Sequence, residues 1–148
     1  MLQVSRRAEY ALRAVLHLAR LQDGQRASFR QIAEHEDAPA EFLAKVLRNL
    51  VDAGLVHSSR GVQGGFSLAR SPSAITFLEV MEAADGPIAL NDCSVAGDGC
   101  AQTPFCDMAQ VWRAGEAAMV DVFRKTSIAE LVAGASSSNP TAHRVDAG

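Results

Sequence analysis

A glycine-rich segment between two short apolar segments constrains the fold of this chain more than any other feature. Leu55 to Ser59 and Phe66 to Ala69 are predicted to be short strands. Arg60 to Gly65, which joins them, contains three glycines in six residues. Such a segment is typical of the tip of a β-hairpin. The fold to which this hairpin belongs depends on the segments that precede it.

Three helices are predicted before the hairpin. Apolar residues recur at helical spacing from residue 2 to about residue 21. Ser28 and Gln31 form a capping box that begins a second, short helix. A third helix is predicted between Pro39, which suits a first helical turn, and Gly54, which suits a helix end. Three helices followed by a hairpin predict a winged helix-turn-helix, whose third helix enters the DNA major groove.

The rest of the chain is predicted to be helical as well. Thr76 and Glu79 form a second capping box, and the helix that they begin stops at Gly86. A short terminal helix begins at Ser127 and ends near Val132. The fold class is therefore mainly α with a small β wing. We expect three parts: a winged helix-turn-helix DNA-binding region over residues 1–70, a linker helix, cysteine loop and dimerisation helix over residues 71–133, and a disordered tail over residues 134–148.

The longest predicted helix runs from about residue 107 to residue 124 and shows heptad spacing. Five residues follow the alternating four- and three-residue steps: Met108, Trp112, Gly115, Met119 and Val122. One such helix cannot bury both its seam and its flanking apolar residues on so small a domain. The pattern therefore favours a homodimer over packing against the same chain.

The charge is unevenly distributed between the two halves of the chain. The whole chain has a net charge of −3, but residues 1–70 hold ten basic and seven acidic residues, a net charge of +3. The remaining residues carry −6. A basic first half suits phosphate binding, although a chance imbalance of solvated faces would look similar. Every apolar run is too short to span a membrane, and no secretion signal is evident, so we expect a cytoplasmic protein.

Candidate DNA contacts lie on the predicted second and third helices and on the wing. Lys45 and Arg48 can meet phosphate or a guanine edge. Arg60 begins the wing, where an arginine suits a narrow minor groove. Gln63 either reads a base edge or only solvates the turn. The predicted DNA-binding residues are Ser28, Ala40, Glu41, Lys45, Arg48, Arg60 and Gln63.

Three cysteines, Cys93, Cys100 and Cys106, lie in one predicted loop. Disulfides explain them poorly, because disulfides are rare in the cytoplasm and one thiol would be left over. Zinc sites usually contain closer cysteine pairs. Longer, irregular spacing tolerates an iron–sulfur cluster. The spacing thus leaves an iron–sulfur cluster, a zinc ion and an ordinary thiol role open.

The order of these parts resembles the Rrf2 family of winged-helix transcriptional regulators, and in particular its iron–sulfur-cluster sensors of the IscR and NsrR type. The resemblance covers about residues 1–133. Its most specific segments are residues 10–13 (Tyr-Ala-Leu-Arg), residues 54–56 (Gly-Leu-Val), the wing over residues 60–68, the three cysteines, and residues 128–132 (Ile-Ala-Glu-Leu-Val).

The resemblance implies a cluster, of the 2Fe-2S or 4Fe-4S type, held by Cys93, Cys100 and Cys106. IscR-like members add a histidine three residues after the last cysteine, but Ala109 occupies that position. NsrR-like members add an acidic residue from the first helix of the other subunit, and Glu9 matches it. The alternative fourth ligands are Asp92 and Asp107. The four histidines are expected to be structural or solvated.

These patterns predict a homodimeric DNA-binding regulator, most simply a repressor, that senses nitric oxide, redox or iron status at a double-stranded operator. One alternative is a cluster-free winged-helix regulator that responds to a thiol modification or to zinc. A second is an iron–sulfur redox protein, in which the wing glycines and Arg60 would have no role. No nucleophile–base pairing, phosphate loop or paired-carboxylate pocket is recognisable, so an enzyme is not expected.

Overall fold

The computed structural model describes residues 3–91, 100 and 105–137. Its elements, in chain order, are α1 (Arg6–Ala19), α2 (Phe29–Glu36), α3 (Ala40–Asp52), β1 (Val56–Ser59), β2 (Gly65–Leu68), the 3-10 turn η1 (Pro72–Ala74), α4 (Phe77–Asp85), α5 (Ala109–Lys125) and α6 (Ile128–Ser137). The predicted fold class, mainly α with a small β wing, is confirmed. No helix in the described part of the chain is long and apolar enough to cross a membrane.

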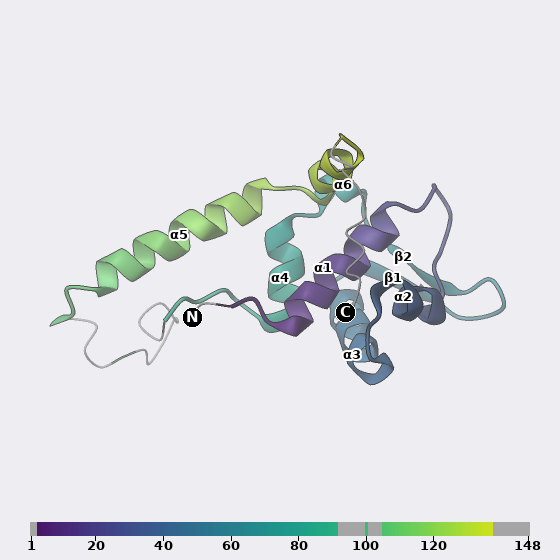
Figure 1. The fold of residues 1–148 in the computed structure, drawn as a ribbon, viewed down its shortest axis with the longest axis horizontal. Coiled ribbons are helices and arrows are strands. Elements are labelled where there is room, and N and C mark those ends of the chain that lie inside the picture. The colour runs from purple at the N-terminus through teal and green to yellow at the C-terminus, as the bar shows by residue number, and fades with distance from the viewer. Residues whose placement is uncertain (1–2, 92–99, 101–104, 138–148) are drawn as a thin grey trace, which may run out of the picture.

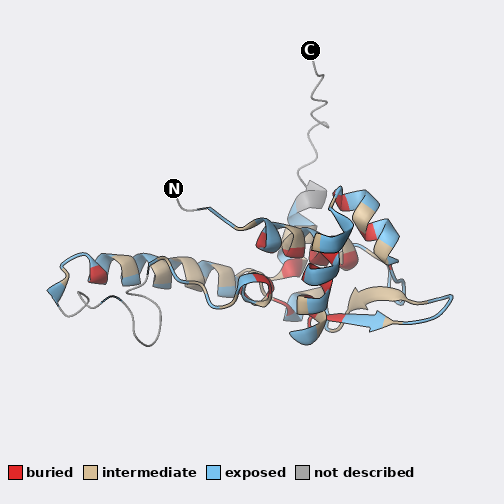
Figure 2. Ribbon diagram, turned by 90° about the horizontal axis from the view of Figure 1, so that it is seen from below, coloured by how far each residue is buried: buried red, intermediate tan, exposed pale blue. Residues whose placement is uncertain are grey.

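The molecule has two regions, a helical body and an arm. Helices α1 to α4 and α6 gather around one core, with the β1–β2 hairpin projecting from one side (Figure 1). Helix α5 extends away from this body on the opposite side (Figure 1). A second view shows the same separation, and in it most of the arm is exposed or half-buried (Figure 2). We call the first region the body and α5 the arm.

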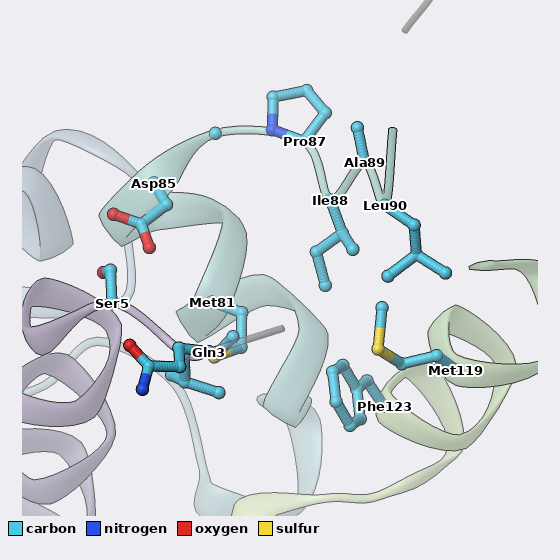
Figure 3. Close-up of a pocket in the computed structure, with 12 residues that line it drawn as sticks. Gln3, Ser5, Met81, Asp85, Pro87, Ile88, Ala89, Leu90, Met119 and Phe123 are labelled. Carbon is cyan, nitrogen blue, oxygen red and sulfur yellow. The ribbon is translucent and has the colours of Figure 1, made fainter. Parts of the chain in front are cut away.

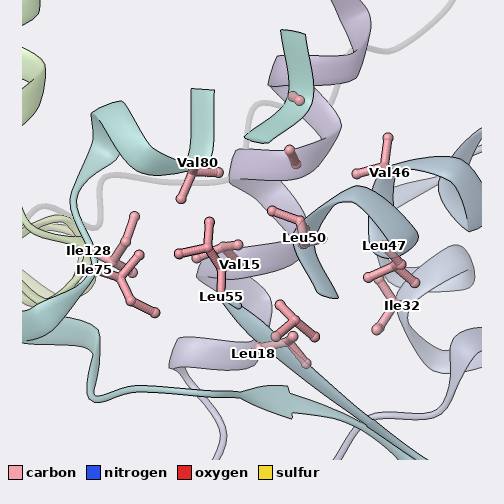
Figure 4. Packing of buried hydrophobic residues seen from close by; sticks show 14 of the residues in the cluster. Val15, Leu18, Ile32, Val46, Leu47, Leu50, Leu55, Ile75, Val80 and Ile128 are labelled. Carbon is pink, nitrogen blue, oxygen red and sulfur yellow. The ribbon is translucent and has the colours of Figure 1, made fainter. Parts of the chain in front are cut away.

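Helix α1 lies at the centre of the core of the body. Three of its alanines, Ala8, Ala11 and Ala14, are fully buried, and their small side chains allow neighbouring helices to approach closely. Val15 of α1 lies beside Leu55, which precedes β1, and on the same side of the helix as Val80 of α4 (Figure 4). The core extends past residue 70, since Ile75, Val80 and Ile128 are completely buried in it. The segments that follow the wing thus share one core with the segments that precede it.

Two helix boundaries differ from the sequence prediction by more than the one or two residues seen at the C-terminal end of α1 and at both ends of α5. Helix α1 begins at Arg6 rather than Leu2, because the Ser5 hydroxyl accepts a hydrogen bond from the backbone N–H of Ala8 at 3.0 Å and caps the helix. Helix α6 continues to Ser137, five residues past the predicted end near Val132. The sequence prediction took the small and polar composition after residue 133 as a sign of disorder. The last turns of α6 contain alanine, however, which is a strong helix former. Residues 138–148 of the predicted tail lie outside the described residues.

The helix-turn-helix has the predicted caps. The Ser28 and Gln31 capping box is present at the start of α2. Helix α2 ends where Asp37 adopts a left-handed conformation, with φ of 46°. Pro39 occupies the cap position just before α3, and Gly54 follows α3 with φ of 71°. Local sequence signals therefore place both ends of this motif correctly.

The wing is tied to the body by a third segment that the sequence did not reveal. Strands β1 and β2 pair antiparallel, with Ser59 opposite Gly65. Ala27, just before α2, then forms a bridge to Phe66 through reciprocal backbone hydrogen bonds of 3.0 and 2.8 Å. A side chain on Gly65 would place its Cβ 2.7 Å from the carbonyl oxygen of Ala27. Glycine at this position therefore permits the close approach that joins the wing to the start of α2.

Candidate DNA interface and cysteine site

Helix α3 separates its residues cleanly between two faces. Its inner face is buried in the core and consists of Leu43, Val46, Leu47 and Leu50. The outer face is exposed and consists of Ala40, Glu41, Ala44, Lys45 and Arg48. The structure thus places the predicted α3 residues together on one accessible surface. Two cations and two small side chains there suit contact with phosphates and base edges.

The wing offers a second exposed surface beyond α3. Arg60 and Gln63 are both exposed, and Val62 at the tip is fully exposed. The backbone at Gly64 is packed so closely that a Cβ would lie 2.4 Å from the carbonyl oxygen of Ser59. The predicted wing residues are therefore held on a tight turn that allows them to reach a partner surface.

A polar hollow lies between the wing and the start of α2. It is lined by Gly24, Arg26, Ser28, Gln31, Val62, Gln63 and Gly64. The Ser28 hydroxyl faces this hollow while it accepts a hydrogen bond from the N–H of Gln31 at 3.2 Å. The sequence prediction missed Arg26, which becomes adjacent to Gln63 only through the bridge between Ala27 and the wing. A cation beside a helix N-terminus suits a phosphate group.

Two of the three cysteines, Cys100 and Cys106, lie in the described part of the chain, and Cys106 lies just before the arm. Cys106 is half-buried, and its carbonyl oxygen accepts a hydrogen bond from the N–H of Ala109 at 3.2 Å. Cys100 is exposed. Ala109 is itself buried and carries no donor atom, so this position cannot supply a fourth ligand. Asp107 is exposed, whereas Cys93 and Asp92 lie outside the described residues.

Glu9 lies in the first turn of α1, with 60% of its side chain exposed. Its carboxylate is 3.6 Å from the guanidinium of Arg13, one helical turn further along. The start of α5, which adjoins Cys106, lies at the outer end of the arm, away from α1 in both views (Figures 1 and 2). The structure therefore does not bring Glu9 and Cys106 together within one chain.

The root of the arm packs on the body, and the rest of the arm does not. Met119 and Phe123 face Ile88 and Leu90 across a largely apolar pocket beside the end of α4 (Figure 3). The Glu116 carboxylate accepts a hydrogen bond from the N–H of Leu90 at 2.9 Å. Residues Gln3 to Ser5, which lead into α1, line the same pocket. The root of the arm and the segment that leads into α1 therefore line one pocket.

Much of the heptad seam remains uncovered in the single chain. Met108 is 63% exposed and Val122 is 59% exposed. Val111, beside the seam, is 71% exposed. Several large apolar side chains left exposed along one helix are typical of an association surface.

Comparison with known proteins identifies the family. A model of the Rrf2 family, described as iron-dependent transcriptional regulators, matches residues 4–134. A protein of Mycobacterium tuberculosis strain H37Rv, described as an HTH-type transcriptional regulator, is 35% identical over 134 residues that cover 90% of this chain and 83% of the relative. The chain belongs to the Rrf2 family.

Two solved structures of this family resemble this Rrf2 protein over nearly its whole length. IscR of T. potens has a TM-score of 0.76 at 26% identity and covers 96% of this chain and 95% of its own. CymR of B. subtilis, described as its global cysteine regulator, has a TM-score of 0.74 at 27% identity and covers 90% of this chain and 98% of its own. This Rrf2 protein is therefore a DNA-binding transcriptional regulator and not an enzyme.

Proposed function

We propose that this Rrf2 protein is a homodimeric repressor that senses nitric oxide, redox or iron status through an iron–sulfur cluster. The observation that carries the proposal is the arm, which leaves much of its apolar seam exposed and has Cys106 just before its outer end, away from the body. An arm of this kind is completed by a second copy of the chain. The dimer would then place two α3 helices and two wings on successive turns of one operator, about 34–36 Å apart.

The donor set fits a cluster. Cys93, Cys100 and Cys106 would supply three thiolates, and Glu9 of the partner subunit would supply a carboxylate. When bound, the cluster would supply iron that reacts with nitric oxide or oxidants. The exposed ion pair between Glu9 and Arg13 contributes at most about 1 kcal/mol, so the carboxylate can exchange this cation for a metal at little cost.

Glu9 is favoured as the fourth ligand over Asp107 because of its place in the fold. Glu9 belongs to α1, the central helix of the body, whereas Asp107 is next to Cys106 on the arm. Ligands drawn from α1 of one subunit and the arm of the other would fix the angle between the two winged helices. Loss of that link would release the angle and weaken binding to both half-sites at once.

The experiment is anaerobic purification from iron-replete cells, with iron and sulfide assays, visible absorption and a gel shift on the promoter of the regulator's own gene. We expect a coloured protein that binds this DNA and loses affinity when nitric oxide is added. Cys106→Ala and Glu9→Gln should lose or destabilise the chromophore. Glu34→Gln is the matched control for Glu9, because Glu34 is also exposed and also pairs with an arginine one helical turn away, in this case the preceding Arg30.

A colourless protein that lacks iron and sulfide, yet binds its operator tightly, would contradict the sensing proposal. It would favour the second candidate, a cluster-free regulator that responds to a thiol modification or to zinc. The likeness to CymR, described as a cysteine regulator, supports that candidate. In that case Cys106→Ala would alter the response to thiol oxidants while the protein remains colourless throughout.

A further inference from the structure

Three side chains with metal-ligating atoms meet between α1 and α2 in the body, away from Cys106 at the outer end of the arm. They are His17 of α1 and His35 and Glu36 at the end of α2, and their ligand atoms all lie within 4.8 Å of one another. The Nδ1 atom of His35 is 2.8 Å from Oε1 of Glu36, and the Nδ1 atom of His17 is 3.9 Å from the same oxygen. The two imidazole rings are 4.4 Å apart, centre to centre. Both rings therefore direct the same kind of nitrogen toward one carboxylate oxygen.

Glu36 is the one charged residue that is buried in the described part of the chain, with 7% of its surface exposed. A buried carboxylate is costly unless its oxygens are paired. Oε2 is satisfied by the guanidinium of Arg13, whose Nε lies 3.3 Å away. Oε1 faces only the two imidazoles among the ion-pair partners found in the described residues. Oε1 of Glu36 and the Nδ1 atoms of His17 and His35 therefore face one another.

We propose that His17, His35 and Glu36 form a binding site for a divalent transition-metal ion, with zinc as the best-fitting candidate. Two imidazoles and one carboxylate, with a water in the fourth position, form a common zinc-binding set. Metal bonds of about 2.0–2.1 Å place tetrahedral ligands about 3.3 Å apart, so the side chains need to move by only about an ångström. A hollow lined by Gln31, Leu21 and both histidines lies beside them and gives access from solvent.

The surroundings of the site support this assignment. Burial lowers the pKa of His17, and the neighbouring His35 lowers the pKa further against the opposing effect of Glu36, a direction that favours the neutral imidazole needed for metal binding. Arg13 holds the second oxygen of Glu36, as residues behind a metal-bound carboxylate commonly do, and acts as a positioning residue. A bound ion would join α1 directly to α2, the helix that precedes the DNA-reading α3.

The test is a cobalt and zinc titration of the full chain in which Cys93, Cys100 and Cys106 are all replaced by serine. With the thiols removed, we expect one cobalt ion per chain, with visible d–d bands and without thiolate charge-transfer absorption. His35→Ala should weaken cobalt and zinc binding at least tenfold. Because the His35 side chain is exposed, this variant should still fold. His57→Ala is the matched control, because His57 is exposed on β1, and it should bind as before.

The chain with its cysteines intact provides an independent check. Metal analysis of anaerobically purified protein should show one zinc equivalent lost in His35→Ala while the iron content stays unchanged. Added zinc should raise the melting temperature of the parent chain and leave that of His35→Ala unaltered. The proposal is overturned if the cysteine-free chain, shown to be folded by circular dichroism, takes up no stoichiometric metal, or if His35→Ala and His57→Ala bind equally. If the protein binds no iron–sulfur cluster at its cysteines, the metal titration of the cysteine-free chain is unaffected, so the two proposals can fail separately.

Discussion

The body and the arm are both built from amphipathic helices, but they use their apolar residues in opposite ways. On α3 of the body, the four inner apolar residues are at most 1% exposed. On α5, the one fully buried residue is Ala109, and Val111 and Val122 remain more than half exposed. The same kind of pattern therefore yields a finished core in one region and an open surface in the other.

This difference separates two sources of stability. The body buries its apolar faces within one chain, so its stability belongs to the single subunit. The arm packs on the body only around Met119 and Phe123, and in the proposed dimer its exposed apolar residues would be covered by the partner (Figure 3). Changes in the body should act on folding or DNA binding, whereas changes in the arm should act on assembly.

The largest effect is expected from Leu50→Ala in the core. Leu50 is completely buried in the core, near Val15 of α1 and Leu55 (Figure 4), so its truncation leaves a cavity. We expect the free energy of unfolding to fall by about 2–5 kcal/mol, measured by urea denaturation.

Val122→Ala provides the counterpart on the arm. Its side chain is 59% exposed in the single chain, so unfolding at low protein concentration should change by less than about 0.5 kcal/mol. Sedimentation equilibrium should instead show a weaker dimer. A loss of monomer stability as large as that of Leu50→Ala would remove the distinction between the two regions.

A pair of glycine substitutions should affect stability in opposite directions. Gly65 has φ of 138°, and a Cβ would lie 2.7 Å from the Ala27 carbonyl oxygen, so Gly65→Ala should destabilise the body by about 1–3 kcal/mol. Gly115 lies in α5, where a Cβ would meet only Leu90 at an ordinary 3.7 Å. Gly115→Ala should therefore stabilise the single chain by up to about 1 kcal/mol, because alanine favours a helix. Thermal unfolding of dilute protein measures both, and equal signs would contradict the prediction.

The sequence predicted those parts of the fold that are encoded locally. The capping box of Ser28 and Gln31 and the glycine after α3 depend on residues a few positions apart, and the structure confirms both. The bridge between Ala27 and Phe66 joins segments almost forty residues apart, and no local pattern signals it. The extent of α6 was underestimated because small residues suit helices and loops alike.

The candidate site follows the same division. The outer face of α3 could be predicted because helical spacing alone separates Lys45 and Arg48 from the buried residues. Arg26 was missed, because it reaches the wing only through the tertiary bridge. The meeting of His17 with His35 and Glu36 was missed for the same reason, since neighbouring positions on two helices form no recognisable spacing.

Arg60→Ala tests whether the body carries DNA recognition. If Arg60 enters the minor groove, its loss should weaken operator binding by about 1–3 kcal/mol. It should also make the binding affinity depend less steeply on salt concentration. Fluorescence anisotropy with labelled operator at several salt concentrations measures both quantities. Arg113→Ala on the arm is the control, since Arg113 is also exposed but lies on α5, and it should leave affinity nearly unchanged. Equal losses for the two variants would assign the effect to overall charge.

Thr76→Ala tests whether the body continues past the wing. Thr76 and Glu79 cap α4, whose residues share the core with α1. Thr76→Ala removes the hydroxyl that accepts from the N–H of Glu79 at 3.2 Å, and should lower stability by about 1 kcal/mol. Because α4 and the winged helix share one core, the loss should appear as a shift of a single cooperative transition rather than as a separate one.

The effect of Thr76→Ala should also depend on pH. Burial opposes ionisation of Glu79, but hydrogen bonds from Thr76 and Arg70 outweigh it and hold the pKa of this carboxyl below its ordinary value of 4.5. A carboxyl with a lowered pKa in the folded state stabilises the protein above pH 4.5, and this contribution is lost as pH falls through the lower value. The difference between Thr76→Ala and the parent chain should therefore shrink under acid conditions, measured by urea denaturation across this range. A difference that stays constant would mean that the Thr76 hydroxyl acts on the backbone alone, without the charge of Glu79.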